Sequence, residues 1–178
     1  MTDLQVDLPI GVIRPVVAAP NPVLSCPCSD VDPRAPEVVQ LAADLLATMA
    51  VSPGCVGLAA NQVGVPWRVF CLDVSNHPRT RTCHGRFVLV NPRVEQASRN
   101  EKAREGCMSV PDFTGDVKRA TRLTVVGVLP GTGQEVTITT DAFEARALQH
   151  EIDHLDGFLF LDRVASAAGV HRRKVYLD

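Results

Sequence analysis

Residues 36–50 carry apolar side chains three or four positions apart, which is the spacing of one face of a helix. Pro36 suits the first turn, because its missing N–H would be unpaired there anyway. Ser52-Pro53-Gly54 follows the last apolar residue and interrupts the pattern. The sequence therefore predicts a helix over 36–50.

A second helical pattern lies near the end of the chain. Leu148, Ile152 and Leu155 form an apolar stripe at i, i+4 and i+7. Asp141-Ala142-Phe143-Glu144 has the spacing of a capping box, and Gly157 stands where a C-terminal stop is expected. This pattern predicts a partly buried helix between Asp141 and Gly157.

The segments between these helices read as strands. Residues 68–74 and 87–90 are apolar runs separated by a polar loop, 75–85. Residues 122–129 and 135–139 are β-branched runs joined by Pro130-Gly131-Thr132-Gly133, which predicts a hairpin. This order of elements indicates an α+β fold, with antiparallel sheets packed around a buried central helix. We find no repeat and no dividing linker, so residues 1–178 are expected to form a single domain.

The two ends of the chain carry weaker patterns. Residues 9–36 contain seven prolines and are expected to cover the surface as extended chain and turns. Residues 163–178 form a basic tail with a weak helical pattern.

Composition narrows the class of protein. The chain has 178 residues, 46% hydrophobic and 21% charged, with a net charge of −2. This balance is ordinary for a globular protein, and it argues against a nucleic-acid-binding surface as the main function. No apolar run is long enough for a membrane span. The first seven residues contain two acids and no basic residue, unlike a secretory signal or transit peptide, so a cytoplasmic location is expected.

Six cysteines raise the question of disulfides. In a cytosolic chain with an adequate core, free thiols or metal ligands are expected instead. Cys26-Pro27-Cys28 has no second Cys or His pair at a matching spacing nearby, so we interpret it as an ordinary loop.

The second predicted helix contains a metal-binding pattern. His150-Glu151-Ile152-Asp153-His154 is a His-Glu-x-x-His motif, whose two imidazoles lie one helical turn apart on one face. Glu151 then lies where it can take a proton from a water molecule held by the metal. The helix with this motif would be the central helix of the fold. The alternative is a surface helix that carries two histidines by chance.

A catalytic site of this kind needs a third protein ligand. No residue beyond His154 has a persuasive spacing for a metalloprotease. Upstream, Cys107 in Glu105-Gly106-Cys107-Met108-Ser109 is expected in a tight loop, although taken alone it could be a buried free thiol. Residues 56–64 are small and include Gln62, whose amide could donate to an oxyanion.

Taken in order, these three segments resemble the peptide deformylase family. The family's glycine-alanine-glutamine stretch corresponds to residues 55–62, its Glu-Gly-Cys-x-Ser to 105–109, and its Gln-His-Glu-x-x-His segment to 149–154. The last two match completely. The first departs at Cys55, where the family has a glycine.

The resemblance implies a role for each matching residue. Cys107, His150 and His154 would bind one divalent metal ion, Fe²⁺ by expectation, with Zn²⁺, Ni²⁺ or Co²⁺ as substitutes. Glu151 would move the proton, and Gln62 with the Met108 N–H would stabilise the oxyanion. The substrate-binding residues would be Val56, Gly57, Gly106, Phe143 and Ala147.

The implied reaction is removal of the N-formyl group from the N-terminal methionine of nascent proteins, with release of formate. Formylmethionyl nascent peptides would be the partners, and the ribosome near its exit tunnel a further one. Two alternatives stay open at this point. One is a zinc peptidase, which would leave the Cys107 segment unused; the other is a deformylase-like protein that binds peptide or ribosome with little catalysis.

Overall fold

The computed structural model describes residues 4–174 of the chain, which include two α-helices and one antiparallel sheet. The helices are α1 (Pro36–Val51) and α2 (Ala142–Leu155), with short 3-10 helices η1 (Pro22–Ser25), η2 (Ala60–Val63), η3 (Phe160–Arg163) and η4 (Ala167–Gly169). The strands are β1 (Gly57–Ala59), β2 (Val69–Leu72), β3 (Phe87–Cys107), β4 (Val110–Val128), β5 (Glu135–Asp141) and β6 (Val170–Arg172).

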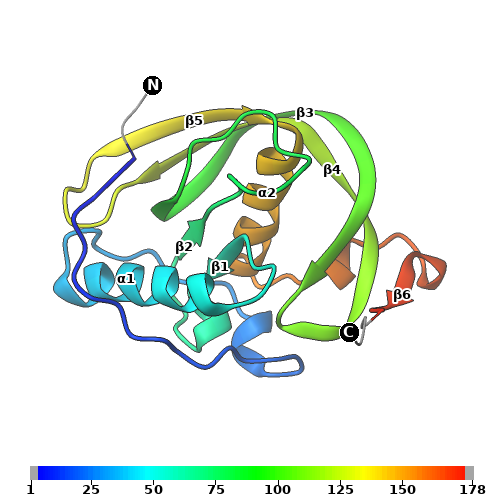
Figure 1. Ribbon diagram of the computed structural model, residues 1–178, viewed down its shortest axis with the longest axis horizontal. Helices are drawn as coiled ribbons and strands as arrows, with labels where there is room; N and C mark the ends of the chain where they lie inside the picture. Colours follow the sequence, from blue (N-terminus) through cyan, green and yellow to red (C-terminus); the bar gives the residue numbers. More distant parts are fainter. Residues whose placement is uncertain (1–3, 175–178) are drawn as a thin grey trace.

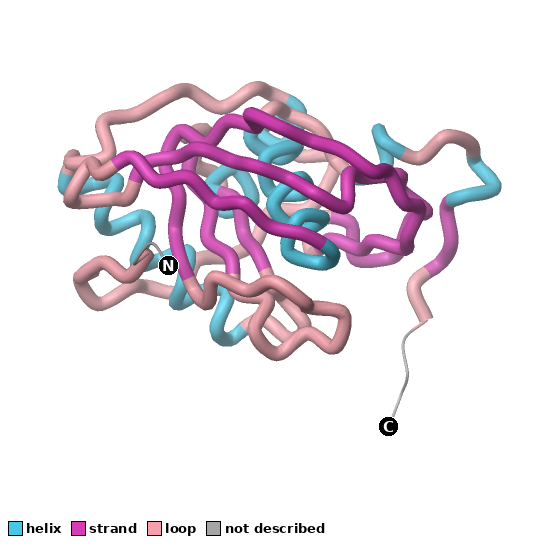
Figure 2. Tube along the Cα trace, turned by 90° about the horizontal axis from the view of Figure 1, so that it is seen from above, coloured by secondary structure: helices cyan, strands magenta, loops and turns pink. Residues whose placement is uncertain are grey.

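The sheet has the strand order β1-β2-β3-β4-β5, and β6 pairs with β4 near its start. Figure 1 shows the long strands β3 and β4 curving over α2, while α1 lies on the other side of β1 and β2. Figure 2, turned by 90°, shows the same strands passing above the helix. The predicted α+β class with antiparallel sheets is confirmed.

The central strands are buried on both faces. Their side chains alternate, so that Phe70 and Leu72 join one hydrophobic cluster and Val69 and Cys71 the other. The first cluster includes Leu148 and Ile152 of α2 and the second includes residues of α1. Because each face of β2 has its own helix, all four residues of this strand are buried. This explains why the sequence shows a continuous apolar run instead of an alternating one.

Both predicted helices form, but the capping box at the start of α2 does not. Asp141 occupies the N-cap position without a side-chain capping bond, and its Oδ1 accepts from the Thr82 N–H at 3.3 Å. The Glu144 carboxylate accepts from Thr140 and pairs with His84 instead. These partners come from β5 and from the loop before β3. The acidic side chains at the start of α2 therefore bind these neighbouring segments and do not cap the backbone N–H groups of the helix. Gly157 adopts a φ of +81°, as expected for a residue that ends a helix.

Two strands are much longer than the hydrophobic pattern predicted. The strand predicted over residues 87–90 is the first part of β3, which continues to Cys107. The strand predicted over residues 122–129 is the last part of β4, which begins at Val110. Beyond the buried part, residues 93–102 of β3 are exposed and mostly polar, and backbone pairing with β4 holds them, so no apolar alternation marks this extension. The first half of β4 buries Val110 and Val117, but the polar Arg119 is buried there as well, which interrupts the apolar pattern. The hairpin between β4 and β5 is confirmed.

The predicted loop around Cys107 is only two residues long. Cys107 is the last residue of β3 and pairs with Val110, so that Met108 and Ser109 alone connect β3 to β4.

The helical prediction for the tail 163–178 is wrong within the described residues. This segment forms η4 and then β6, which adds to the edge of β4 at Phe113–Gly115. Backbone pairing with an open strand edge outweighs a weak helical propensity. Residues 175–178 lie outside the described part.

Other expectations can be checked directly. All six cysteines are free, as predicted. The proline-rich segment is irregular over residues 9–35, apart from η1 and a single β-bridge between Ser29 and Trp67, as predicted; Pro36 begins α1. Among residues 4–174, neither α-helix combines the length and the apolar character needed to cross a membrane.

A buried carboxylate holds the N-terminal segment on α1. Asp44 is 1% exposed and accepts hydrogen bonds from the Val12 N–H at 2.8 Å, from Gln40 at 2.9 Å and from Arg14 Nε at 2.7 Å. Burial alone would raise the pKa of Asp44, but these donors and the Arg14 charge lower the pKa below its usual value. The ionised carboxylate therefore stabilises the folded state.

We predict that Asp44→Asn lowers the free energy of unfolding at pH 7 by about 1–3 kcal/mol, because a charged acceptor is lost from a buried site. The folded-state pKa is depressed, so this contribution is present above about pH 3.9 and is lost as the pH falls below it. Urea unfolding at pH 7 and pH 3 measures the effect. Glu37→Gln, on the exposed first turn of the same helix, is the control. An Asp44→Asn cost that is equal at both pH values would contradict this assignment.

Candidate active site

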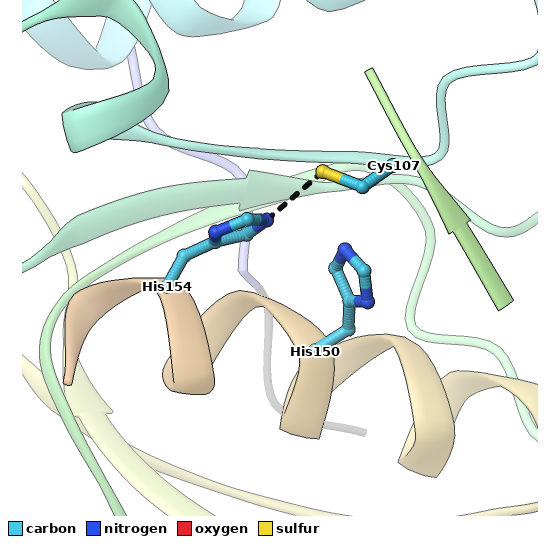
Figure 3. A group of neighbouring side chains, drawn as sticks. All are labelled: Cys107, His150 and His154. Atoms are coloured by element: carbon cyan, nitrogen blue, oxygen red, sulfur yellow. Dashed lines mark hydrogen bonds between the residues drawn. The ribbon is translucent and has the colours of Figure 1, made fainter. Parts of the chain in front are cut away.

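Three side chains from distant parts of the sequence converge below β3. One ligand atom each from Cys107, His150 and His154 lies within 4.8 Å of the others. Cys107 Sγ is 3.2 Å from His154 Nε2, and the two imidazole rings meet edge to face, with their centroids 4.9 Å apart (Figure 3). A sulfur and two ring nitrogens at this separation form a donor set suited to a zinc or iron ion.

Local structure explains this convergence. His150 and His154 are one turn apart on α2, so both rings project from the same face of the helix (Figure 3). Cys107 reaches them from the other side, because β3 ends there and the two-residue turn reverses the chain. The Asn61 side chain donates to the His154 carbonyl at 2.6 Å and so joins η2 to the end of α2.

Gln62 lies beside the cysteine. Its Nε2 donates to Cys107 Sγ at 3.3 Å and to Ser109 Oγ at 3.1 Å, and its Oε1 accepts from the Ala59 N–H at 3.0 Å. The amide is therefore fixed with its donor group directed toward the metal-binding residues.

Glu151 is a buried carboxyl without a full set of partners. It is 3% exposed, and its Oε2 has no hydrogen-bond partner within the described part of the chain. Burial is the largest influence and raises the pKa of Glu151 to about 7, against the opposing charges of His150 and Arg119. A carboxyl with a pKa near neutrality can both accept and release a proton at physiological pH.

Gly57 makes room for this carboxyl. A Cβ built on Gly57 would lie 2.5 Å from Glu151 Oε1 and 2.8 Å from its carboxyl carbon. Any larger residue at position 57 would therefore displace Glu151.

A buried ionic network lies behind His150. Glu105 accepts from Arg119 Nε at 2.7 Å and from Arg146 Nη1 at 2.7 Å, and its other oxygen lies 3.1 Å from His150 Nδ1. Arg119 also donates to Asp153 at 2.7 Å. Burial alone would raise the pKa of Glu105, but His150 and Arg119 hold the pKa at about 2. With Nδ1 of His150 engaged by Glu105, Nε2 is free to face the metal.

The charges around the three ligands favour a cation. Burial and the neighbouring His150 lower the pKa of His154, which keeps it neutral as a ligand must be. Burial would also lower the pKa of His150, but Cys107 and Glu105 raise it well above its usual value. The negative groups thus favour positive charge at this point, which a divalent ion supplies.

The three candidate ligands lie at a cleft of about 340 Å³. All five residues expected to bind substrate line it, together with Gln62, Met108, Cys107, His150 and Glu151. The buried His154 does not line it. The structure therefore brings together the residues that the sequence singled out, in one cleft with the metal-binding group.

Several residues at this site gave no sequence signal. His77, from the loop before β3, lines the cleft and stacks on Phe143 with the ring centroids 3.5 Å apart. Arg173, which follows β6, donates to the Cys107 carbonyl at 3.1 Å, and a Cβ on Gly106 would lie 2.7 Å from its Nη2. The position of each residue depends on contacts between residues far apart in the sequence, and no local sequence pattern predicts such contacts.

Three side chains suited to hold a metal ion lie at a cleft, with a buried carboxyl beside them. This is the arrangement of a metal-dependent hydrolase. Comparison with known proteins identifies the family. The polypeptide deformylase family model matches residues 13–169. Peptide deformylase 2 of Streptomyces avermitilis is 41% identical over 164 residues, covering 92% of this chain and 84% of that protein.

Solved structures agree. The peptide deformylase of Thermotoga maritima superimposes with a TM-score of 0.78 at 30% identity and covers 87% of this chain and 99% of its own. The class I type b peptide deformylase of Acinetobacter baumannii, with Met-Ala-Ser bound, gives a TM-score of 0.78 at 33% identity, covering 85% and 99%. The chain belongs to the peptide deformylase family. It is a metal-dependent hydrolase that removes the formyl group from N-terminal methionine.

We predict that Glu105→Gln weakens metal binding about 10- to 100-fold, because His150 loses the charged acceptor that orients its ring. Competition with a chelator measures the affinity. Glu95→Gln, on an exposed part of the same strand, is the matched control. Equal affinity of the Glu105→Gln and Glu95→Gln proteins would show that Glu105 does not support the metal site.

Proposed function

We propose that this chain deformylates nascent proteins with Cys107, His150 and His154 as metal ligands and Glu151 as the group that moves the proton. The observation that carries the proposal is the buried Glu151 carboxyl beside the three converging side chains, whose Oε2 has no hydrogen-bond partner within residues 4–174. When bound, the ion supplies a Lewis acid that makes water nucleophilic near neutral pH.

Glu151 has two tasks in this proposal. With a pKa of about 7, it accepts the proton of the attacking water and then passes that proton to the departing amine. The second step matters because an amide nitrogen leaves poorly without protonation. Gly57 keeps the carboxyl in place, since a side chain there would occupy its position.

Attack on the formyl carbon develops negative charge on its oxygen. The Gln62 amide lies 3.3 Å from Cys107 Sγ, held by Ala59 and Ser109, and so offers a fixed donor near the reacting atoms. The Met108 N–H, in the turn after Cys107, is the proposed second donor. Removal of one such donor typically costs about 10²–10³ in rate.

The substrate backbone would bind as an added strand. β1 is the edge of the sheet, so Gly57 can offer backbone groups to a peptide, and Gly106 faces it from the end of β3. Contacts of this kind read no side chain, which suits an enzyme that acts on many sequences. Val56, Phe143 and Ala147 would form the walls around the methionine side chain. The relative from A. baumannii was solved with Met-Ala-Ser, which supports this assignment.

Iron is the proposed metal, with Zn²⁺, Ni²⁺ or Co²⁺ as substitutes. The donor set of one thiolate and two imidazoles suits both iron and zinc, so the choice of Fe²⁺ rests on the family. The proposal also takes residues 1–178 as one catalytic domain, supported by a sheet that runs continuously from β1 to β5. A cytoplasmic location stays a prediction. The ribosome as a partner stays a prediction.

The decisive experiment is release of formate from a formyl-methionyl tripeptide by anaerobically prepared, iron-loaded protein. No formate release at full metal occupancy would refute the proposed function. Hydrolysis of a peptide bond in unformylated peptides, with release of a C-terminal residue or of two fragments, would favour a peptidase instead.

We predict that Glu151→Gln keeps the metal but lowers turnover at least about 10²-fold, because an amide cannot accept the proton. Elemental analysis is therefore expected to give an unchanged metal content, while the rate of formate release falls. Cys107→Ala is the contrasting variant, in which metal content and turnover fall together. Substantial turnover by Glu151→Gln would exclude Glu151 as the proton carrier.

The departure at Cys55 is predicted to be harmless. Cys55 lines the rim of the cleft, its thiol donates to the Gly57 carbonyl at 3.1 Å, and burial raises its pKa to about 12. It is therefore a protonated thiol rather than a nucleophile. Cys55→Gly should keep kcat/KM for a formyl-methionyl peptide within about tenfold, or about 1.4 kcal/mol. A much larger loss would mean that the thiol takes part in catalysis.

A further inference from the structure

A second cleft, of about 490 Å³, adjoins the substrate cleft and is rich in arginine. The two clefts share Arg104, Phe143 and Arg146 as lining residues. The arginines of the second cleft are Arg79, Arg81, Arg99, Arg104, Arg122 and Arg146. Among residues 4–174, the carboxylates that line it with them are those of Glu101 and Asp141.

Four of these six arginines have no side-chain partner within the described part of the chain. Arg146 and Arg104 are paired, with Glu105 and Asp116 respectively. The side chains of Arg79, Arg81, Arg99 and Arg122 make no hydrogen bond or ion pair with any residue from 4 to 174. Four exposed guanidinium groups around one cleft make the local electrostatic potential positive, which favours the binding of an anion.

The arginines are held by structure on three sides. Arg99 lies on β3 and Arg122 on β4. In the register of the two strands, the backbone of Arg122 lies opposite Ser98, the residue before Arg99. The loop between β2 and β3 passes near the start of α2 (Figure 1). Arg79 and Arg81 belong to this loop and line the cleft together with Asp141 and Ala142. The contacts that hold this loop on α2 include the His84 pair with buried Glu144 at 2.7 Å and the stacking of His77 on Phe143.

Strand β3 connects the two clefts. Residues 104–107 line the substrate cleft, and Arg99, Glu101, Ala103 and Arg104 line the arginine cleft. A peptide with its formyl end near Cys107 that follows β3 advances about 3.3 Å per residue. Three residues, about 10 Å, bring it beside Arg104, and about eight residues bring it beside Arg99.

We propose that the arginine cleft binds acidic side chains of the substrate, at about the fourth to eighth residue of the nascent chain. This inference rests on the proposed function and adds a charge preference to it. A backbone-only substrate cleft reads no side chains, so this preference would come from outside the methionine pocket. Guanidinium groups suit carboxylates because they donate two parallel hydrogen bonds.

The test compares formyl-Met-Ala-Ser peptides extended by five Glu, five Gln or five Lys residues. At low ionic strength, kcat/KM is expected to fall in that order, with Glu about tenfold above Gln, mainly through KM. The preference is expected to shrink at high salt, since screening weakens these attractions. A peptide that carries its acidic residue at position 2 instead of positions 4–8 is expected to lose most of the gain in kcat/KM.

The matched variants are Arg99→Gln/Arg122→Gln and Arg34→Gln/Arg86→Gln. All four arginines are exposed and unpaired within residues 4–174, but Arg34 and Arg86 line neither cleft. The first double variant is expected to process the three peptides at similar rates, while the second keeps the order Glu, Gln, Lys. Thermal unfolding of both variants checks that the fold is unchanged.

The outcomes separate this inference from the proposed function. No turnover of any peptide would refute the proposed function. Turnover of all three peptides with equal kcat/KM would overturn only the acidic preference. Binding of a short single-stranded RNA that is lost in Arg99→Gln/Arg122→Gln, together with equal peptide rates, would also overturn it and assign the cleft to nucleic acid.

Discussion

The active site depends on one buried ionic interaction, in which Arg119 of β4 lies between two carboxylates. Glu105 from β3 and Asp153 from α2 each accept from its guanidinium at 2.7 Å. Removing such groups from water is costly, and the cost is offset only if every charge has a close partner. This requirement fixes the position of β3 and β4 relative to α2. Since Glu105 also holds His150, the same interaction orients a proposed metal ligand.

Around this network, the site combines two opposite electrostatic demands. Cys107 and Glu105 favour positive charge at His150. Burial meanwhile raises the pKa of the nearby Glu151 to about 7, so that its carboxyl can gain or lose a proton near neutral pH. A carboxylate fully ionised at all pH values would bind the cation more strongly but would be a weaker base. Gly57 is the residue that permits this arrangement, because its missing side chain leaves space for the Glu151 carboxyl.

The charge of the whole chain hides a strongly uneven surface. The net charge is −2, yet unpaired arginines gather in the cleft beside the substrate site. Composition alone argued against a nucleic-acid-binding surface as the main function, and it could say nothing about local concentration of charge. The arginines come from β3, β4 and the loop before β3, so only folding brings them together.

The sequence by itself determined the features that depend on neighbouring residues. The i, i+4 spacing of His150 and His154, the ends of α1 and the β4–β5 hairpin all follow from local periodicity and turn chemistry. The matching motifs around Gln62 and Cys107 also named the residues that line the cleft. Tertiary structure decided the lengths of β3 and β4, the β6 pairing of the tail, the Glu105–Arg119–Asp153 network and the arginine cleft. These features are contacts between polar residues that are distant in sequence, and no hydrophobic period along the chain encodes such contacts.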